Sequence, residues 1–253
     1  MKVSKEEAKQ YFALYAEHSE EYRKRINEAE WIIEDALIRN PNKSLIAFSG
    51  GKDSLVMMHL VRGVNKRLNK DILVIHWDYG RTYIPIEIHN KIIEIVNRYK
   101  PYIVETSILY DKLKDKAINI LGTEYLGKLM PKLYNDGYVD CFVGLRSQES
   151  CKRRLRIANH RSITKQAEIF PVGNFNWEDI WGYIFENNLG YLSCYYDVYC
   201  PIVGWDKTRF TTLFDKEFDK FGSSNIDNVL MWRYLNEKNK MDGKHKKLKK
   251  TEK

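Results

Sequence analysis

The chain has 253 residues, 43% of them hydrophobic and 30% charged, and a formal net charge of +8; this composition excludes wholesale disorder and allows a sizeable core. Its longest apolar runs are far shorter than the roughly 20 residues of a membrane-spanning helix, and no apolar signal-peptide core follows Met1, so we expect a cytoplasmic protein without membrane contact. Four cysteines without a CxxC pair argue against a disulfide framework, a zinc ribbon and an iron–sulfur cluster.

The first predicted element is helical. Over residues 5–39, apolar side chains recur at three-, four- and seven-residue steps among Glu and Lys, which is typical of an amphipathic helix. The sequence Asn40-Pro41-Asn42 ends this helix. We therefore expect residues 1–41 to form an N-terminal helical segment.

Strands and helices alternate in the next part of the chain. We expect buried strands, separated by helical segments, at residues 44–48, 72–77, 102–106 and 139–144. This order implies right-handed crossovers and an α/β fold, a doubly wound, mostly parallel sheet with helices on both faces, as in Rossmann-like proteins. We assign residues 42–200 to this nucleotide-binding domain and residues 201–235 to a helical or irregular C-terminal extension.

A glycine-rich hexapeptide, Ser49-Gly50-Gly51-Lys52-Asp53-Ser54, joins the first strand to the next helix. Paired glycines let the backbone turn sharply and approach a ligand. The free amides and the dipole of a helix N-terminus favour an anion, serine hydroxyls can donate to phosphate or sulfate, and Lys52 adds a positive charge. Asp53 could cap the helix or hold magnesium. We interpret the segment as a phosphate-binding loop, with a plain Gly-Gly turn as the alternative; it lacks the Walker spacing.

Two further polar residues follow predicted strands closely. Asp78 comes after the second strand and Arg146 after the fourth. Ligands of parallel sheets bind beyond the carboxyl ends of the strands. We therefore expect the glycine loop, Asp78 and Arg146 on one rim of the sheet.

The segment 44–60, SLIAFSGGKDSLVMMHL, strongly resembles the PP-loop signature of the ATP pyrophosphatase, or adenine nucleotide alpha hydrolase, superfamily. Within it, the chain is most similar to the PAPS (phosphoadenosine phosphosulfate) reductase branch. Asp78-Tyr79-Gly80 stands where that family has an Asp-Thr-Gly-like segment, and residues 144–153 match Gly-x-Arg-x-x-Glu-Ser-x-x-Arg. Residues 170–197, with FP, WEDIWGYI and YYD, resemble its Pro…Trp…Asp-Val-Trp-x-Tyr-Ile…Tyr-Asp region.

The resemblance implies roles for these residues. The terminal phosphate or sulfate of ATP, PAPS or APS would contact Ser49, Gly50, Gly51, Lys52, Asp53 and Ser54, and the adenosine would lie near Asp78 and Gly144. Together with Lys52, Arg146 and Arg153 would neutralise a leaving pyrophosphate or a bound sulfate. Lys152, Arg154 and Arg156 fit a solvated basic helix face at least as well, and Glu149 could be a structural partner of Arg153.

Cysteine usage departs from the family. Its phosphosulfate reductases carry a nucleophilic cysteine in a Glu-Cys-Gly-x-His-type segment, and no cysteine follows Cys200 here. That chemistry needs a thiolate to attack sulfur. Cys194 and Cys200 are candidate replacements, although a role as buried structural thiols suits them better.

Three functions remain open at this point. One is an adenylyl-transferring ATP pyrophosphatase with ATP and magnesium, acting in sulfur metabolism or in the sulfur modification of a nucleic acid. Another is a sulfonucleotide reductase with a relocated cysteine, working with thioredoxin or another sulfur-transfer partner. The third is a non-catalytic nucleotide-binding regulator. The acceptor of the adenylyl group leaves no signature in the sequence.

Lysine dominates the end of the sequence, and residues 236–253 hold much of the excess positive charge. We expect this tail to be disordered and solvated. The alternative is an arm that binds the phosphates of a nucleic acid.

Overall fold

The computed structural model describes residues 1–39, 43–78, 86–100, 102–106 and 121–210. Among these residues, no helix combines the length and the apolar character needed to cross a bilayer. The basic tail and most of the predicted C-terminal extension lie outside the described residues. The boundaries predicted for them stay predictions.

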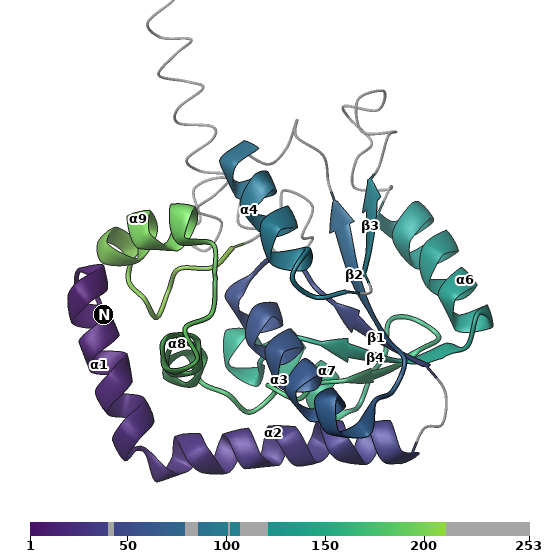
Figure 1. The fold of residues 1–253 in the computed structure, drawn as a ribbon, viewed down its shortest axis with the longest axis horizontal. Coiled ribbons are helices and arrows are strands. Elements are labelled where there is room, and N and C mark those ends of the chain that lie inside the picture. The colour runs from purple at the N-terminus through teal and green to yellow at the C-terminus, as the bar shows by residue number, and fades with distance from the viewer. Residues whose placement is uncertain (40–42, 79–85, 101, 107–120, 211–253) are drawn as a thin grey trace, which may run out of the picture.

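The N-terminal segment is helical, but the prediction of one continuous helix was wrong. Two helices, α1 (Lys5–His18) and α2 (Glu20–Arg39), meet at Ser19. The Ser19 backbone is extended, and its hydroxyl accepts a hydrogen bond from the Tyr22 N–H at 3.2 Å. The apolar repeat runs through the break because both helices bury side chains in the same core, so the periodicity alone did not mark the corner that Figure 1 shows.

Five parallel strands form the sheet in the order β3-β2-β1-β4-β5. Their bounds are β1 (Lys43–Ala47), β2 (Ile72–Asp78), β3 (Tyr102–Thr106), β4 (Tyr138–Val143) and β5 (Ala167–Ile169). The four predicted strands are all present. The fifth was missed because three residues are too few for a periodic pattern.

Helices cover both faces of the sheet, which confirms the predicted doubly wound fold. Residues of β1 alternate between two cores: Ile46 packs with α3 (Lys52–Leu68) and α4 (Ile86–Val96), whereas Leu45 packs with α6 (Met130–Asn135). A π-helix, η2 (Leu121–Leu129), leads into α6. Figure 1 shows α6 on the opposite side of the sheet from α3 and α4.

The chain after β4 forms the short helix η3 (Ser147–Glu149) and the helices α7 (Cys151–Ala158), α8 (Trp177–Glu186) and α9 (Ser193–Val203). Helix α8 packs against α1 through Asp179, whose side chain is fully buried. Asp179 accepts hydrogen bonds from Tyr15 at 2.7 Å and from Arg25 at 3.0 Å. One carboxylate therefore fastens both N-terminal helices to the body, and they share a single core with the sheet.

Candidate nucleotide-binding site

The glycine loop turns from the end of β1 into α3. Gly50 has a φ of +87°, and a Cβ there would lie 2.8 Å from the Ile92 side chain. Ser54 Oγ donates to the Gly51 carbonyl at 2.9 Å and lies 3.1 Å from Ser49 Oγ. The backbone at Gly50 thus requires glycine, and the two serines hold the loop curled over the start of α3.

Gly144, at the end of β4, allows the loop to sit directly on the sheet. A Cβ at this position would lie 2.6 Å from Ser54 Cα and 2.7 Å from Ser54 N. No side chain fits such a gap between two backbones. This close approach gives Gly144 a structural role beneath the loop, which the predicted adenosine contact did not include.

A chain of charged side chains connects the loop to the segment after β4. Arg146 is buried, and its Nε donates to Asp53 Oδ1 at 2.6 Å while its Nη2 lies 3.8 Å from Glu149 Oε1. Lys52 Nζ, also buried, lies 3.4 Å from Asp53 Oδ2, and Arg153 pairs with Glu149. The tertiary structure thus joins the three predicted catalytic cations through two carboxylates.

The charge states of the loop follow from this pairing. Burial lowers the pKa of Lys52, against the raising effect of Asp53. Burial alone would raise the pKa of Asp53, but the Arg146 and Lys52 charges hold it down at about 2. Asp53 is therefore ionised at neutral pH.

The suggestion that Asp53 holds magnesium is not supported by its surroundings. Both carboxylate oxygens face cations: Oδ1 accepts from Arg146, and Oδ2 lies near Lys52. A metal ion would have to displace these positive charges or be repelled by them. The geometry instead makes Asp53 the group that orients Arg146.

Asp78 lies at the end of β2 on the same rim and is buried. His89 Nδ1, from α4, lies 3.3 Å from Asp78 Oδ1. His76 hydrogen-bonds the Phe48 carbonyl at 2.9 Å, and burial lowers the pKa of its imidazole, so it is neutral and acts in packing. The pairing of His89 with Asp78 joins two elements, so nothing in the local sequence indicated it; Tyr79 and Gly80 lie outside the described residues.

Two residues beside the loop were missed by the sequence reasoning. The Tyr196 hydroxyl, from α9, accepts a hydrogen bond from the Lys52 backbone N–H at 3.4 Å, and Lys52 Nζ lies 5.8 Å from the centre of the Tyr196 ring. Arg209 donates to the Glu149 carbonyl at 3.1 Å, and its charge contributes to lowering the pKa of Lys52. The only available signal was the family-like Tyr-Asp motif at Tyr196; nothing marked Arg209.

Neither candidate cysteine has the surroundings of a nucleophile. Cys200 is buried, and burial raises its pKa to about 12. Cys194 is exposed, yet partial burial of its thiol also raises its pKa. Nucleophilic cysteines have lowered pKa values, so these surroundings favour the alternative that Cys194 and Cys200 are structural thiols.

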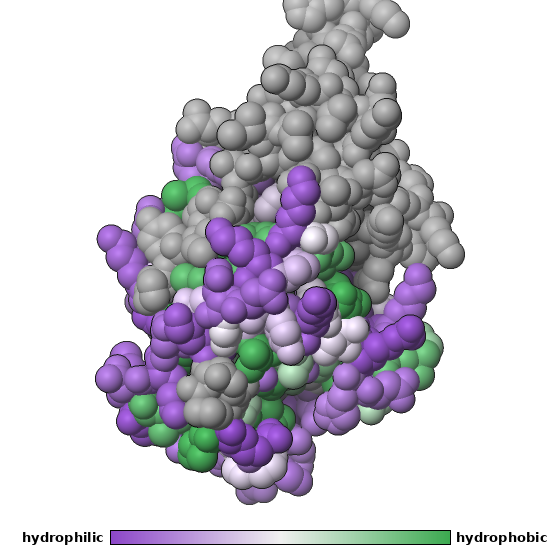
Figure 2. All heavy atoms as spheres, turned by 90° about the vertical axis from the view of Figure 1, so that its right-hand side faces the viewer, coloured by the Kyte–Doolittle hydropathy of each residue, from purple (hydrophilic) through white to green (hydrophobic). Residues whose placement is uncertain are grey.

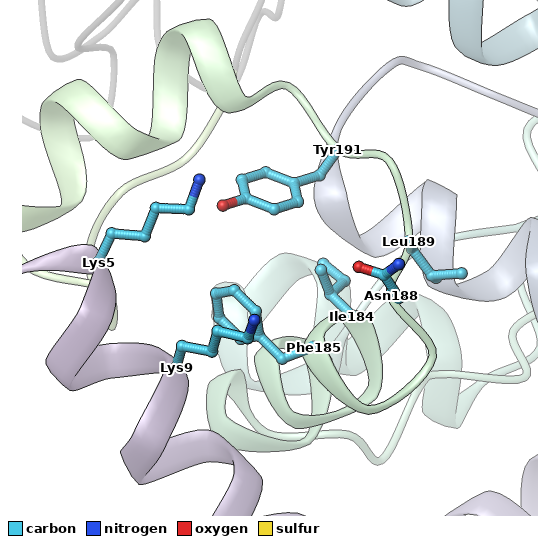
Figure 3. Close-up of a pocket in the computed structure, with 7 residues that line it drawn as sticks. All are labelled: Lys5, Lys9, Ile184, Phe185, Asn188, Leu189 and Tyr191. Carbon is cyan, nitrogen blue, oxygen red and sulfur yellow. The ribbon is translucent and has the colours of Figure 1, made fainter.

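A separate pocket of about 430 Å³ lies between α1 and the end of α8. Figure 3 shows its lining, with the Lys5 amine and the Tyr191 hydroxyl directed toward each other. Both groups are already bonded to Asp197, at 2.7 and 2.6 Å. No residue of the glycine loop lines this pocket, so it is distinct from the candidate nucleotide site.

The fold and the loop define a PP-loop α/β protein with a buried cationic site at the carboxyl ends of its strands. The family model described as phosphoadenosine phosphosulfate reductase domain matches residues 43–210, most of the chain. The protein belongs to this family. The predicted resemblance is thereby confirmed.

Two solved structures are similar in fold. U34-tRNA thiolase NcsA from Methanococcus maripaludis, with its [4Fe-4S] cluster, matches with 15% identity and a TM-score of 0.49, over 67% of this chain and 65% of the thiolase, slightly under two thirds of its length. NAD+ synthetase from Burkholderia pseudomallei matches with 11% identity and a TM-score of 0.47, over 72% of this chain and 84% of that chain. No curated protein is similar enough in sequence to count as a match.

The comparison corrects the expectation that an iron–sulfur cluster is excluded. The solved structure of NcsA, to which this chain is similar, contains a [4Fe-4S] cluster, so the expectation of no cluster does not stand. The described residues do not bring together three or more His, Cys, Asp or Glu side chains able to hold a metal ion.

Proposed function

We propose that this protein binds ATP at the glycine loop and transfers its adenylyl group to an acceptor. An oxygen of the acceptor attacks the α-phosphorus, the bond from that phosphorus to the bridging oxygen breaks, and the electron pair leaves with pyrophosphate. The observation that carries the proposal is the buried Lys52–Asp53–Arg146 arrangement at the N-terminus of α3. It places two cations where a polyphosphate would meet free helix amides.

Each part of the site has a role in this reaction. The amides and the dipole at the start of α3 favour the anionic tail of the nucleotide. The hydroxyls of Ser49 and Ser54 now bond each other and can turn to phosphate oxygens. Lys52 and Arg146 stabilise the charge that grows on the leaving pyrophosphate, so the work of the protein is positioning and charge stabilisation.

Two side chains act on Arg146 rather than on the nucleotide. Asp53 holds its Nε at 2.6 Å, and Glu149 lies 3.8 Å from its Nη2 while pairing with Arg153. A guanidinium fixed on two sides presents its remaining N–H groups in a set direction. We assign Asp53 and Glu149 as the two residues that position Arg146, and Arg153 as the residue that holds Glu149.

The second candidate function is reduction of a phosphosulfate nucleotide, which the name of the matched domain favours. It requires a thiolate to attack sulfur and release a nucleotide phosphate. The raised pKa of Cys200, about 12, speaks against that step. A regulator that binds nucleotide without turnover is the third candidate, and the shape of the loop supports it equally.

Pyrophosphate release from ATP tests the proposal. The assay is run with wild type, Lys52→Met and the control Lys66→Met, which changes an exposed lysine of the same helix. We expect Lys52→Met to slow release by roughly 100-fold or more, as loss of a transition-state contact does, and Lys66→Met to leave it unchanged.

The acceptor is varied in parallel among sulfate, a carboxylate, a flavin and a nucleic acid. Failure to release pyrophosphate with every one of them would overturn the pyrophosphatase proposal. Sulfite release from a phosphosulfate with reduced thioredoxin, lost in Cys200→Ser or Cys194→Ser, would establish the reductase instead. ATP binding that survives without any turnover would establish the regulator.

A further inference from the structure

Helix α7 differs from the other helices around the site because none of its residues is buried. Helices in globular proteins ordinarily bury an apolar stripe. The segment 151–167, which contains α7 and the turn after it, holds six Lys or Arg residues and no Asp or Glu. A short helix of one charge sign without a buried face is stabilised little by the core and is open to a partner.

The cations of this segment fall into two groups. Arg153 and Arg156 are directed inward: Arg153 pairs with Glu149, and Arg156 Nε donates to Glu168 Oε2 at 3.0 Å. The other group is exposed and forms no ion pair with any described residue; we call it the α7 surface, and it consists of Lys152, Arg154, Arg161 and Lys165. The inward pairs fix the helix in place, and the outer four present positive charge to solvent.

We propose that the α7 surface binds the phosphate backbone of a nucleic acid, which supplies the acceptor for the adenylyl group. The surface begins three residues after Glu149 in sequence, and Glu149 contacts Arg146, which contacts Asp53 of the glycine loop. A strand lying along α7 would therefore reach the rim where the nucleotide phosphates are expected. The role of the nucleic acid as acceptor rests on the proposed function. Its binding to the α7 surface does not.

A nucleic acid fits this surface better than a membrane does. An anionic bilayer is bound by a helix that also inserts a broad apolar face, whereas the exposed large apolar side chains of this segment are Leu155 and Ile163 alone. A phosphodiester chain offers a regular row of negative charges, which Lys and Arg bind independently of sequence. Exposed aliphatic side chains between the cations can rest against sugars and bases.

Binding is measured by fluorescence polarisation of a labelled single-stranded RNA of about 20 nucleotides, without ATP, across a range of salt concentrations. One variant of the full chain changes Lys152, Arg154, Arg161 and Lys165 to Ala. Its control changes four exposed cations elsewhere to Ala, with an equal loss of charge: Lys24, Lys66, Arg67 and Lys132. We expect the α7 variant to bind at least about 10-fold more weakly and its salt slope to flatten by up to about 3, from four lost phosphate contacts.

Three outcomes of these measurements would overturn the proposed RNA-binding site. If both quadruple variants lose RNA affinity equally, only net charge matters and the assignment to α7 is overturned. It is also overturned if the α7 variant keeps the wild-type RNA affinity and only removal of residues 236–253 lowers it. If binding to phosphatidylserine vesicles is lost in the α7 variant while its RNA binding is unchanged, the surface is a membrane contact instead. ATP binding is measured on every variant: its absence in wild type contradicts the proposed function, and leaves the RNA result standing.

Discussion

Two regions that meet at the start of α3 are held together by different forces. The loop region, Ser49 to Ser54 with Arg146 and Glu149, contains buried and half-buried ions paired at distances such as the 2.6 Å between Arg146 and Asp53. The aromatic cluster packs rings around Trp181, whose side chain is fully buried; its members are Phe12, Trp181, Phe185, Tyr191, Tyr196 and Trp205. Ion pairs can exchange one partner for a ligand, whereas packed rings cannot move without opening a cavity.

Tyr196 joins the two regions. Its ring lies 5.1 Å from that of Trp181, and its hydroxyl accepts the Lys52 N–H. The cluster therefore supports the base of the loop through one side chain. We infer that the packed rings contribute most to the stability of the fold, whereas the ion pairs can rearrange when a ligand binds. Tyr196 contacts both regions. The rings of Trp181, Tyr196 and Trp205 are buried. On the face that Figure 2 shows, hydrophilic side chains predominate between smaller hydrophobic groups.

The largest expected effect is on the aromatic cluster. Trp181→Ala removes a ring that lies 4.8 Å from Trp205 and 5.1 Å from Tyr196, and a hydrogen bond from its Nε1 to the Trp205 carbonyl at 3.0 Å. We expect the free energy of unfolding to fall by about 3–5 kcal/mol, measured by urea denaturation. Trp181→Phe should lose less, and an equal loss would mean that the indole N–H, not the ring volume, matters.

The second largest loss of stability is expected in the loop region. Asp53→Asn removes the carboxylate that lies 2.6 Å from the buried Arg146 Nε and 3.4 Å from the buried Lys52 Nζ. We expect a loss of about 3 kcal/mol from the free energy of unfolding. The double variant Asp53→Asn with Arg146→Met should recover part of that loss because, of the two buried cations that faced Asp53, only Lys52 remains. If the single and double variants unfold alike, the pair is not the source of stability.

The same pair predicts a pH dependence. The pKa of Asp53 is held at about 2, below its ordinary value of 3.8, so its contribution is fully present above about pH 4 and is lost as the pH falls toward 2. The difference in unfolding free energy between wild type and Asp53→Asn should shrink over that window. A difference that stays constant from pH 5 to pH 2 would contradict the depressed pKa.

A smaller effect is expected where the regions meet. Tyr196→Phe keeps the ring in the cluster and removes only the acceptor for the Lys52 N–H. We expect a stability loss of about 1 kcal/mol and an ATP affinity within about threefold of wild type, because a phosphate can take the freed amide. A tenfold weaker affinity by calorimetry would show that the hydroxyl itself contacts the nucleotide.

Thiol reactivity gives the mildest test, without any substitution. Cys200 lies buried near the aromatic cluster with its pKa raised to about 12, and Cys141 is likewise buried with a pKa of about 12. Cys151, at the start of the exposed α7, is accessible. Iodoacetamide at pH 8, followed by peptide mass spectrometry, should label Cys151 quickly and Cys200 only on unfolding; fast native labelling of Cys200 would reopen the reductase assignment.

The sequence by itself determined much of the fold and the position of the site. Buried strands show as runs of apolar residues, and a glycine-rich turn between strand and helix needs particular residues at adjacent positions, such as Gly50 with its φ of +87°. Both signals are local, so they can be recognised in the sequence without the tertiary structure. The charge on Lys52 and Arg146 and their place after strands indicated the same rim of the sheet.

Only the tertiary structure decided what depends on contacts between distant segments. Four features could not be predicted from residue spacing in the sequence. They are the corner at Ser19, the fit of Gly144 against Ser54, the hydrogen bond of the Tyr196 hydroxyl with Lys52 and the contact of Arg209 with Glu149. The state of Cys200 belongs here as well, because a pKa is set by burial and neighbouring charge rather than by residue type. Sequence fixes which groups are available, and packing decides which of them meet and in what dielectric surroundings.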